Sequence, residues 1–229
     1  MNKEKGTFYA VGVGPGDPEL MTRQACAVLE RCPVIAAPKT RSGRMLALDI
    51  ARGSVCMDEK TVLALEFTMS RDEAVRLESY RTAAEEVARE LDRGQDVAMV
   101  NLGDVSVYAT AYYILDAVRA LGYDTVMIPG VTSFSAVAAR LGCSLTEPER
   151  PLHILPGGER LDEALALPGT KVLMKSGSAV HDAVRALDRA GLLDRAGMVA
   201  DCGLPSERVF TDLRELPEDV SYFATVIVH

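Results

Sequence analysis

The sequence lacks long apolar runs, and its first residues lack the features of a secretory signal. No hydrophobic stretch approaches the roughly 20 residues that a membrane-spanning helix needs. The first six residues are mostly polar and lead directly into an expected strand, whereas a signal peptide continues into an apolar segment. These absences predict a cytoplasmic protein without a membrane partner.

Cysteine and histidine are few and scattered. The sequence has no C-x-x-C pair of the kind that metal and redox sites use, and its three histidines lie far apart in the chain. We therefore expect no bound metal ion and no nucleophile triad. The cysteines are expected to be reduced and buried, and they are Cys26, Cys32, Cys56, Cys143 and Cys202.

Positively charged residues are fewer than negatively charged ones, and the formal net charge is −8. Nucleic-acid binding relies on lysine and arginine to neutralise phosphates, so the charge argues against a nucleic-acid partner. One short basic cluster, with Lys39, Arg41 and Arg44, follows the second expected strand. It is either a solvated loop or a site for carboxylates, which the arginine fork binds well.

What the sequence does contain is an alternation of strand and helix patterns. Strands are expected at 7–13, 34–37, 61–65, 96–102 and 125–128, and helices at 22–31, 45–51, 71–93, 109–121 and 133–141. The helix at 71–93 is expected to bury one apolar side, formed by Ala74, Leu77, Ala84, Val87, Ala88 and Leu91. This order predicts a doubly wound α/β domain.

A composition shift at 144–151 suggests a domain boundary, because this stretch has two prolines, three charges and no apolar periodicity. We expect an N-terminal α/β domain at 1–143, a linker at 144–151 and a second α/β domain at 152–229. In the second domain, strands are expected at 152–155, 171–174, 198–201, 208–211 and 222–228, with helices at 161–167 and 179–190. The short connections near the end predict a mixed second sheet.

The first expected strand runs into a loop with Gly12, Gly14 and Gly16. Glycines there would let a flat ligand approach the backbone at the carboxyl edge of the sheet. The dinucleotide-binding pattern fails, because Asp17 stands where its third glycine belongs and no acid closes the second strand. A nicotinamide or flavin site is therefore disfavoured, while a tight turn without a ligand remains possible.

Three further loops end strands. The first contains Gly103 and Asp104, and its carboxylate could bind an amine, a hydroxyl or a cation. In the second, Thr132 or Ser133 can cap a helix while facing a ligand. The third carries Lys175 after a second-domain strand, where it would face the first domain at a junction that favours small molecules.

Four such segments in this order resemble the tetrapyrrole methylase family. The resemblance covers essentially the whole chain, and within the family it points to the branch that methylates C20 of precorrin-2 or cobalt-precorrin-2. The sequence departs from the family at two positions. Thr68 stands where that branch usually has proline, and Val105 stands in place of the proline of the family's Gly-Asp-Pro loop. The motifs that carry the resemblance are Gly12-Val-Gly-Pro-Gly-Asp-Pro-Glu-Leu-Met-Thr22, Ala37-Pro-Lys39, Leu65-Glu-Phe-Thr-Met-Ser-Arg-Asp72 and Pro129-Gly-Val-Thr-Ser-Phe134.

The resemblance implies two α/β domains with a ligand cleft between them, in a cytoplasmic homodimer. It implies S-adenosylmethionine as methyl donor, S-adenosylhomocysteine as product and a tetrapyrrole as small-molecule substrate. The implied donor-binding residues are Leu102, Gly103, Asp104, Val107, Thr132, Ser133, Lys175 and Gly203. The tetrapyrrole would lie over Gly12, Gly14, Pro15, Gly16 and Asp17, with its carboxylates near Lys39, Arg41 and Arg44.

Asp104 is our candidate catalytic residue near the reacting centre, and its alternative role is to hold the donor or its own loop. Other functions stay open as alternatives. They are methyl transfer to another ring carbon of a corrin precursor, and tetrapyrrole binding without catalysis. A methylase of the same fold acting on ribosomal RNA is disfavoured by the acidic net charge.

Overall fold

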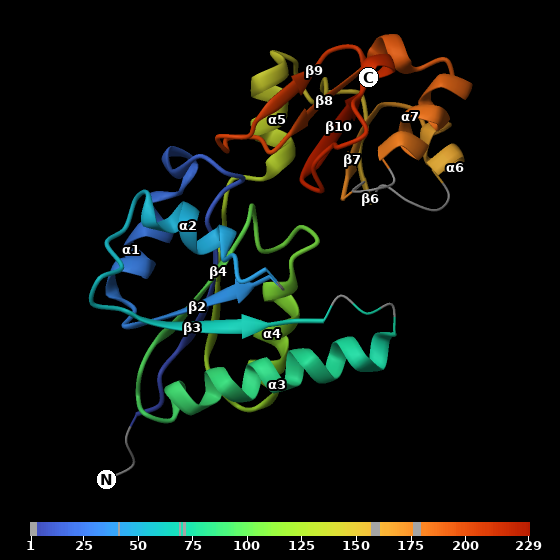
Figure 1. Ribbon diagram of the computed structural model, residues 1–229. Helices are drawn as coiled ribbons and strands as arrows, with labels where there is room; N and C mark the ends of the chain where they lie inside the picture. Colours follow the sequence, from blue (N-terminus) through green and yellow to red (C-terminus); the bar gives the residue numbers. More distant parts are fainter. Residues whose placement is uncertain (1–3, 41, 69, 71, 157–160, 176–179) are drawn as a thin grey trace. The chain divides into compact units, whose positions relative to one another are not determined.

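The computed structural model describes residues 4–40, 42–68, 70, 72–156, 161–175 and 180–229 (Figure 1). The chain forms two compact units, Met1–Thr132 and Ser133–His229, called here the first and the second unit. Each unit has its own five-stranded sheet and its own hydrophobic core. The predicted fold class, α/β with two sheets, is confirmed. None of the described helices is long and apolar enough to cross a membrane.

The sheet of the first unit is parallel throughout, with the strand order β3-β2-β4-β1-β5. Its strands lie at the expected places, with ends shifted by two residues at most. They are β1 (Phe8–Gly12), β2 (Val34–Lys39), β3 (Thr61–Glu66), β4 (Val97–Asn101) and β5 (Thr125–Ile128). Because all five run the same way, the loops that follow them lie at one edge of the sheet.

Helices cover both faces of this sheet, as Figure 1 shows. On one face α1 (Arg23–Arg31) packs on β1, and α2 (Leu46–Arg52) packs on β2 and β4. On the other face α3 (Glu73–Leu91) and α4 (Thr110–Ala120) pack on each other and on the strands. The core on that side is made by alternate strand residues, as period-2 burial predicts.

The first half of α3 differs from its predicted packing. Asp72 caps the helix through hydrogen bonds to the N–H groups of Ala74 and Val75. The expected apolar side is buried only from Ala84 onward, and Leu77 is 52% exposed. The amphipathic pattern therefore continues beyond the part of the helix that the sheet covers.

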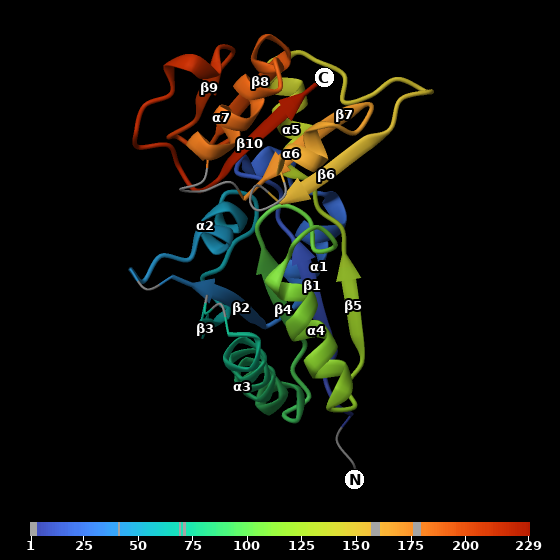
Figure 2. The same ribbon diagram turned by 90° about the vertical axis from the view of Figure 1, so that its right-hand side faces the viewer.

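The sheet of the second unit is mixed, as expected, with the order β6-β7-β10-β8-β9. Strands β6 and β7 are parallel, while β10 is antiparallel to both β7 and β8, and β9 is antiparallel to β8. Figure 2 shows β10 between its two neighbours. The strands are β6 (Leu152–Pro156), β7 (Thr170–Met174), β8 (Ala196–Ala200), β9 (Arg208–Phe210) and β10 (Ala224–Val228).

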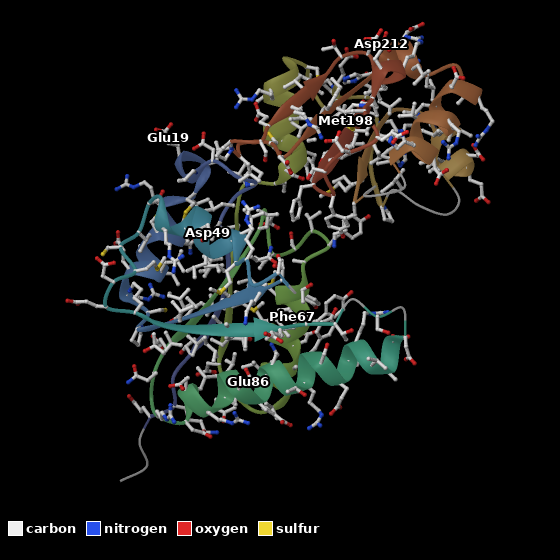
Figure 3. All side chains as sticks on the ribbon, viewed as in Figure 1. Glu19, Asp49, Phe67, Glu86, Met198 and Asp212 are labelled. Carbon is white, nitrogen blue, oxygen red and sulfur yellow. The ribbon has the colours of Figure 1, made fainter. Side chains whose placement is uncertain are left out.

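Among the described residues, the α-helices of this unit are α5 (Ser133–Leu141), α6 (Leu161–Leu165) and α7 (Val180–Arg189). Helix α5 packs on β8 and β10, which places it in the second unit, whereas the predicted boundary at 144–151 assigned it to the first domain. The core under α6 and α7 includes Met198, which Figure 3 labels on β8. The described part of the chain also has 3-10 helices that were not expected, namely η1 (Pro18–Leu20) in the first unit and η3 (Leu193–Arg195) and η4 (Leu213–Glu215) in the second.

The cysteines are all free, but only two of them are buried. Cys32 and Cys202 are buried, Cys26 and Cys143 are partly exposed, and Cys56 is exposed. The expectation that all five are buried is therefore wrong.

Candidate functional site

At the carboxyl edge of the first unit, four glycines bring together the backbone at the end of β1 and in the loops that follow β1, β4 and β5. Gly14 and Gly103 form an isolated antiparallel bridge, in which the N–H of each donates to the carbonyl of the other, at 3.2 and 2.7 Å. A Cβ atom on Gly12 would lie 2.7 Å from both the Gly103 oxygen and the Gly130 nitrogen, and one on Gly130 would be closer still to Gly103. Glycine at position 12 thus lets the backbones of Gly103 and Gly130 approach closely. The sequence alone does not show whether a glycine there makes space for backbone or for a ligand.

Gly103 differs from the glycines that it touches. Its φ is +73°, and a Cβ atom on it would meet no heavy atom within 4 Å. The side of this residue that faces away from Gly12 and Gly130 is therefore open. A side chain at this position would extend into that open space, as it would at Gly43 and Gly122 of the same unit.

Asp104 ties two of these loops together. Its Oδ2 accepts a hydrogen bond of 2.8 Å from the Gly130 N–H, and its Oδ1 accepts from the N–H and the hydroxyl of Ser106. Burial would raise the pKa of Asp104, but the hydrogen bonds from Ser106 and Gly130 outweigh it, so the pKa lies below its ordinary value. A carboxylate held in this way is a weak proton acceptor, so these contacts favour the loop-holding role.

Asn101 supports the same loop, and the sequence analysis missed it. This buried residue ends β4, and its side-chain N–H groups donate to the carbonyl oxygens of Leu102 and Asp104, at 2.8 and 3.2 Å. Ser106, the partner of Asp104, was also missed. A buried polar residue at the end of an otherwise apolar strand is the signal that could have identified Asn101.

The residues expected on the tetrapyrrole side lie in separate local structures. Asp17 caps η1, since its Oδ1 accepts from the Glu19 N–H at 2.9 Å, and Pro15 and Gly16 connect this cap to the Gly14 bridge. Lys39, at the end of β2, forms an ion pair of 3.1 Å with Glu66 at the end of β3.

Of the other basic residues in that cluster, Arg44 is exposed and Arg41 lies outside the described residues. The backbone of Arg44 closes a turn with Thr40, whose hydroxyl accepts from the Arg44 N–H at 3.0 Å. The side chain of Arg44 is thus available at the surface, while Lys39 already has an acidic partner.

In the second unit, two predicted segments meet at one edge of the sheet. Strands β7 and β8 both run antiparallel to β10, so their carboxyl ends flank the start of β10. Lys175 follows β7, and Gly203 belongs to the loop that follows β8. Lys175 is exposed, yet the protein around its ammonium group displaces part of the water there, which lowers its pKa.

The predicted hydroxyl residues lie where α5 begins. The Ser133 hydroxyl is 3.5 Å from that of Thr225, a buried residue of β10, and Thr132 directly precedes the helix. Helix α5 therefore starts beside β10, the strand that Lys175 and the Gly203 loop flank.

Left-handed backbone marks the same loops. Among the described residues other than glycine, positive φ occurs at Tyr108, Lys175 and Asp201, with values of 49°, 55° and 54°. Tyr108 directly follows Val107 in the loop after β4, and the other two directly follow β7 and β8. Such backbone costs on the order of 1–3 kcal/mol and collects at functional sites. All three positions fall in the loops that carry the predicted donor-binding residues.

The described residues contain no group of three or more histidine, cysteine, aspartate or glutamate side chains that could hold a metal ion. The acceptors at both sheet edges are instead engaged by N–H groups and hydroxyls, as the contacts of Asp104 and Asp201 illustrate.

Comparison with known proteins adds independent evidence. The family model described as Tetrapyrrole (Corrin/Porphyrin) Methylases matches residues 7–217. A cobalt-precorrin-2 C(20)-methyltransferase of Salmonella typhimurium is 31% identical, over 98% of this chain and 96% of that protein. The cobalamin biosynthesis protein CobIJ of Mycobacterium bovis is 32% identical over 98% of this chain, which spans 46% of that relative.

A solved structure shows the same fold. It is the cobalt precorrin-4 methyltransferase CbiF, which superposes with a TM-score of 0.75 at 20% identity, covering 97% of this chain and 94% of the other. At this identity the likeness concerns the fold alone. The family model and the full-length relative go further, and they show that this chain belongs to the tetrapyrrole methylase family.

Proposed function

We propose that this protein transfers the methyl group of S-adenosylmethionine to C20 of precorrin-2 or cobalt-precorrin-2, in cobalamin biosynthesis. The observation that carries the proposal is the 31% identity, over nearly the full length of both chains, to a relative named for that reaction. The structure supports it with an open space beside Gly103 and three left-handed residues in the loops expected to bind the donor.

The proposed chemistry asks the protein mainly to align two reactants. A sulfonium methyl is an activated electrophile, and a meso carbon between pyrrole rings of a reduced tetrapyrrole is an electron-rich nucleophile. Alignment of reacting atoms can lower a barrier by up to about 7–11 kcal/mol in favourable intramolecular cases. The close backbone contacts among Gly12, Gly103 and Gly130 suit this task, because they hold the three segments against one another.

Within this proposal, the loops after β4 and β8 and the start of α5 bind the donor, and the loop after β1 with the end of β2 binds the tetrapyrrole. The Lys39–Glu66 ion pair means that a substrate carboxylate would compete with Glu66 for Lys39, whereas Arg44 is exposed. The family resemblance also supports a homodimer, which light scattering after size exclusion would test.

The first test is anaerobic incubation with methyl-labelled S-adenosylmethionine and precorrin-2, with and without cobalt. Mass spectrometry counts the methyl groups added, and carbon NMR locates them. One methyl at C20 is the expected result, and the relative rates select the metal-free or the cobalt substrate. A methyl on another carbon would support the alternative corrin methyltransferase, and tight pigment binding without transfer would support a carrier.

A second test addresses the donor site. Gly103→Leu should abolish binding of S-adenosylhomocysteine in calorimetry, because the new side chain would extend into the open space at this position. Gly103→Ala is the matched control, since it brings the same strain at φ +73° with a far smaller side chain, and it should bind more tightly than the leucine variant. Equal affinities of folded leucine variant and wild type would refute this placement.

A further inference from the structure

The carboxylate of Glu207 joins two parts of the second unit that carry predicted donor-binding residues. Its Oε2 accepts a hydrogen bond of 2.7 Å from the Gly203 N–H. Its Oε1 lies 2.8 Å from Nε of Arg140, in the last turn of α5. The Glu207 side chain is 19% exposed, so this carboxylate is largely shielded from water.

The loop that Glu207 holds is fixed at its other end by Asp201. Asp201 adopts left-handed backbone, and its carboxylate accepts hydrogen bonds from the hydroxyls of Ser206 and Ser221. Its N–H donates to the Phe223 carbonyl just before β10. The segment from Asp201 to Glu207 is therefore closed on itself and attached to the start of β10.

Helix α5 connects this loop to the other predicted donor residues. The helix begins at Ser133, whose hydroxyl lies beside Thr225, and it carries Arg140 near its end. A rigid helix held at both ends has a fixed position along its axis. The Glu207–Arg140 ion pair thus links the last turn of α5, the helix that begins at Ser133, to the loop that contains Gly203.

We propose that Glu207 is a positioning residue for the methyl donor, acting through the Gly203 N–H and through Arg140. This inference rests on the proposed function, since it assumes that the edge formed by β7, β8 and β10 binds S-adenosylmethionine. A hydrogen bond to a charged, shielded acceptor is stronger than one between neutral groups, which suits a contact that must hold a loop in one arrangement.

The test compares Glu207→Ala, Glu207→Gln and Arg140→Ala with the wild type, by calorimetry with S-adenosylhomocysteine and by initial rates. Glu207→Ala should weaken binding about tenfold or more and raise KM for S-adenosylmethionine, with KM for the tetrapyrrole unchanged. Glu207→Gln keeps an oxygen for the Gly203 N–H but loses the charge opposite Arg140, so it and Arg140→Ala should fall in between.

The matched control is Asp194→Asn. Asp194 also forms an ion pair with an arginine, Arg214, but it precedes β8 and so lies at the opposite edge of the sheet. The Asp194→Asn variant should bind S-adenosylhomocysteine with the affinity of the wild type. If Glu207→Ala does not fold, Glu207→Gln and Arg140→Ala decide the matter.

Failure of this inference is distinct from failure of the proposed function. A wild type that binds no S-adenosylhomocysteine would overturn both. A wild type that binds it, together with folded Glu207 variants of equal affinity, would overturn only the positioning role. Equal increases in the two KM values would also overturn it, because they would indicate a general structural loss.

Discussion

The two units shape the carboxyl edges of their sheets by different means. In the first unit, glycines let backbone touch backbone, as between Gly12, Gly103 and Gly130. In the second unit, carboxylates hold the loop after β8, as Asp201 and Glu207 do, and left-handed backbone falls on Lys175 and Asp201. The first unit also has a loop-holding carboxylate, Asp104, and a left-handed residue, Tyr108, but adds the glycine contacts to them. The glycine contacts depend on the absence of side chains, and the second-unit contacts depend on hydrogen bonds. Substitutions should therefore lower stability for different reasons in the two units, by overlap of atoms in the first and by loss of hydrogen bonds in the second.

The largest effect is expected from Gly130→Ala in the first unit. The new Cβ atom would overlap the Gly103 carbonyl oxygen and lie 2.9 Å from the Gly12 Cα, and neither backbone can move without disturbing β1 or β4. We expect the free energy of unfolding to fall by about 3 kcal/mol in urea denaturation.

Gly122→Ala is the control for this change. Gly122 has φ +84°, and a Cβ atom there would meet nothing within 4 Å, so only backbone strain of about 1 kcal/mol is expected. Gly130 does not adopt left-handed backbone, so a loss there no larger than that of Gly122→Ala would mean that the neighbouring backbones move aside and that their contact does not require glycine at 130.

A smaller effect is expected from Asp201→Ala in the second unit. This change removes the acceptor of two serine hydroxyls and leaves alanine in left-handed backbone, so the free energy of unfolding should fall by about 1–2 kcal/mol. Asp201→Asn should lose less, because asparagine retains an acceptor and tolerates positive φ. The comparison between the units would be contradicted if the asparagine variant were the less stable of the two.

The smallest effect at neutral pH is expected from the buried thiols, one in each unit. Burial raises the pKa of Cys32 and of Cys202 to about 11, from an ordinary value of 9.0. The folded state thus keeps these protons when the unfolded state releases them. The associated stability is fully present below pH 9 and is lost as the pH rises through about 11.

Unfolding free energies at pH 8, 9 and 10 would measure this dependence. Cys32→Ala and Cys202→Ala should each reduce the decline with pH, whereas Cys56→Ala, at an exposed position, should leave it as in the wild type. If all three variants retain the wild-type slope, some other group causes the alkaline loss of stability.

The elements of the fold could be predicted from the sequence, because strand and helix periods alternate clearly along it. The predicted helix at 133–141 coincides with α5, yet its assignment to a unit depends on packing against β8 and β10, which local periodicity does not encode. The exposure of Leu77 was missed for the same reason, since a pattern shows an apolar side without showing what covers it.

Less of the candidate site could be predicted. The glycines of the first unit were recognised as significant from the sequence. Only the structure shows that neighbouring backbone fills the space where a Gly12 side chain would lie, whereas the corresponding space at Gly103 is open. The partnership of Glu207 and Arg140 joins residues far apart in sequence, and nothing in either local motif indicates it. The basic cluster was visible, whereas the pairing of Lys39 with Glu66 follows from the register of β2 and β3.

The place of β10 has a consequence for the order in which the protein folds during synthesis. The strands of the first unit all lie within residues 1–132, so its sheet can form as soon as that segment has left the ribosome. The second sheet has its last strand at its centre, between β7 and β8. Until Ala224–Val228 emerges, β7 and β8 each lack a hydrogen-bonded neighbour on that side, so the second sheet cannot be completed before the last strand has been synthesised.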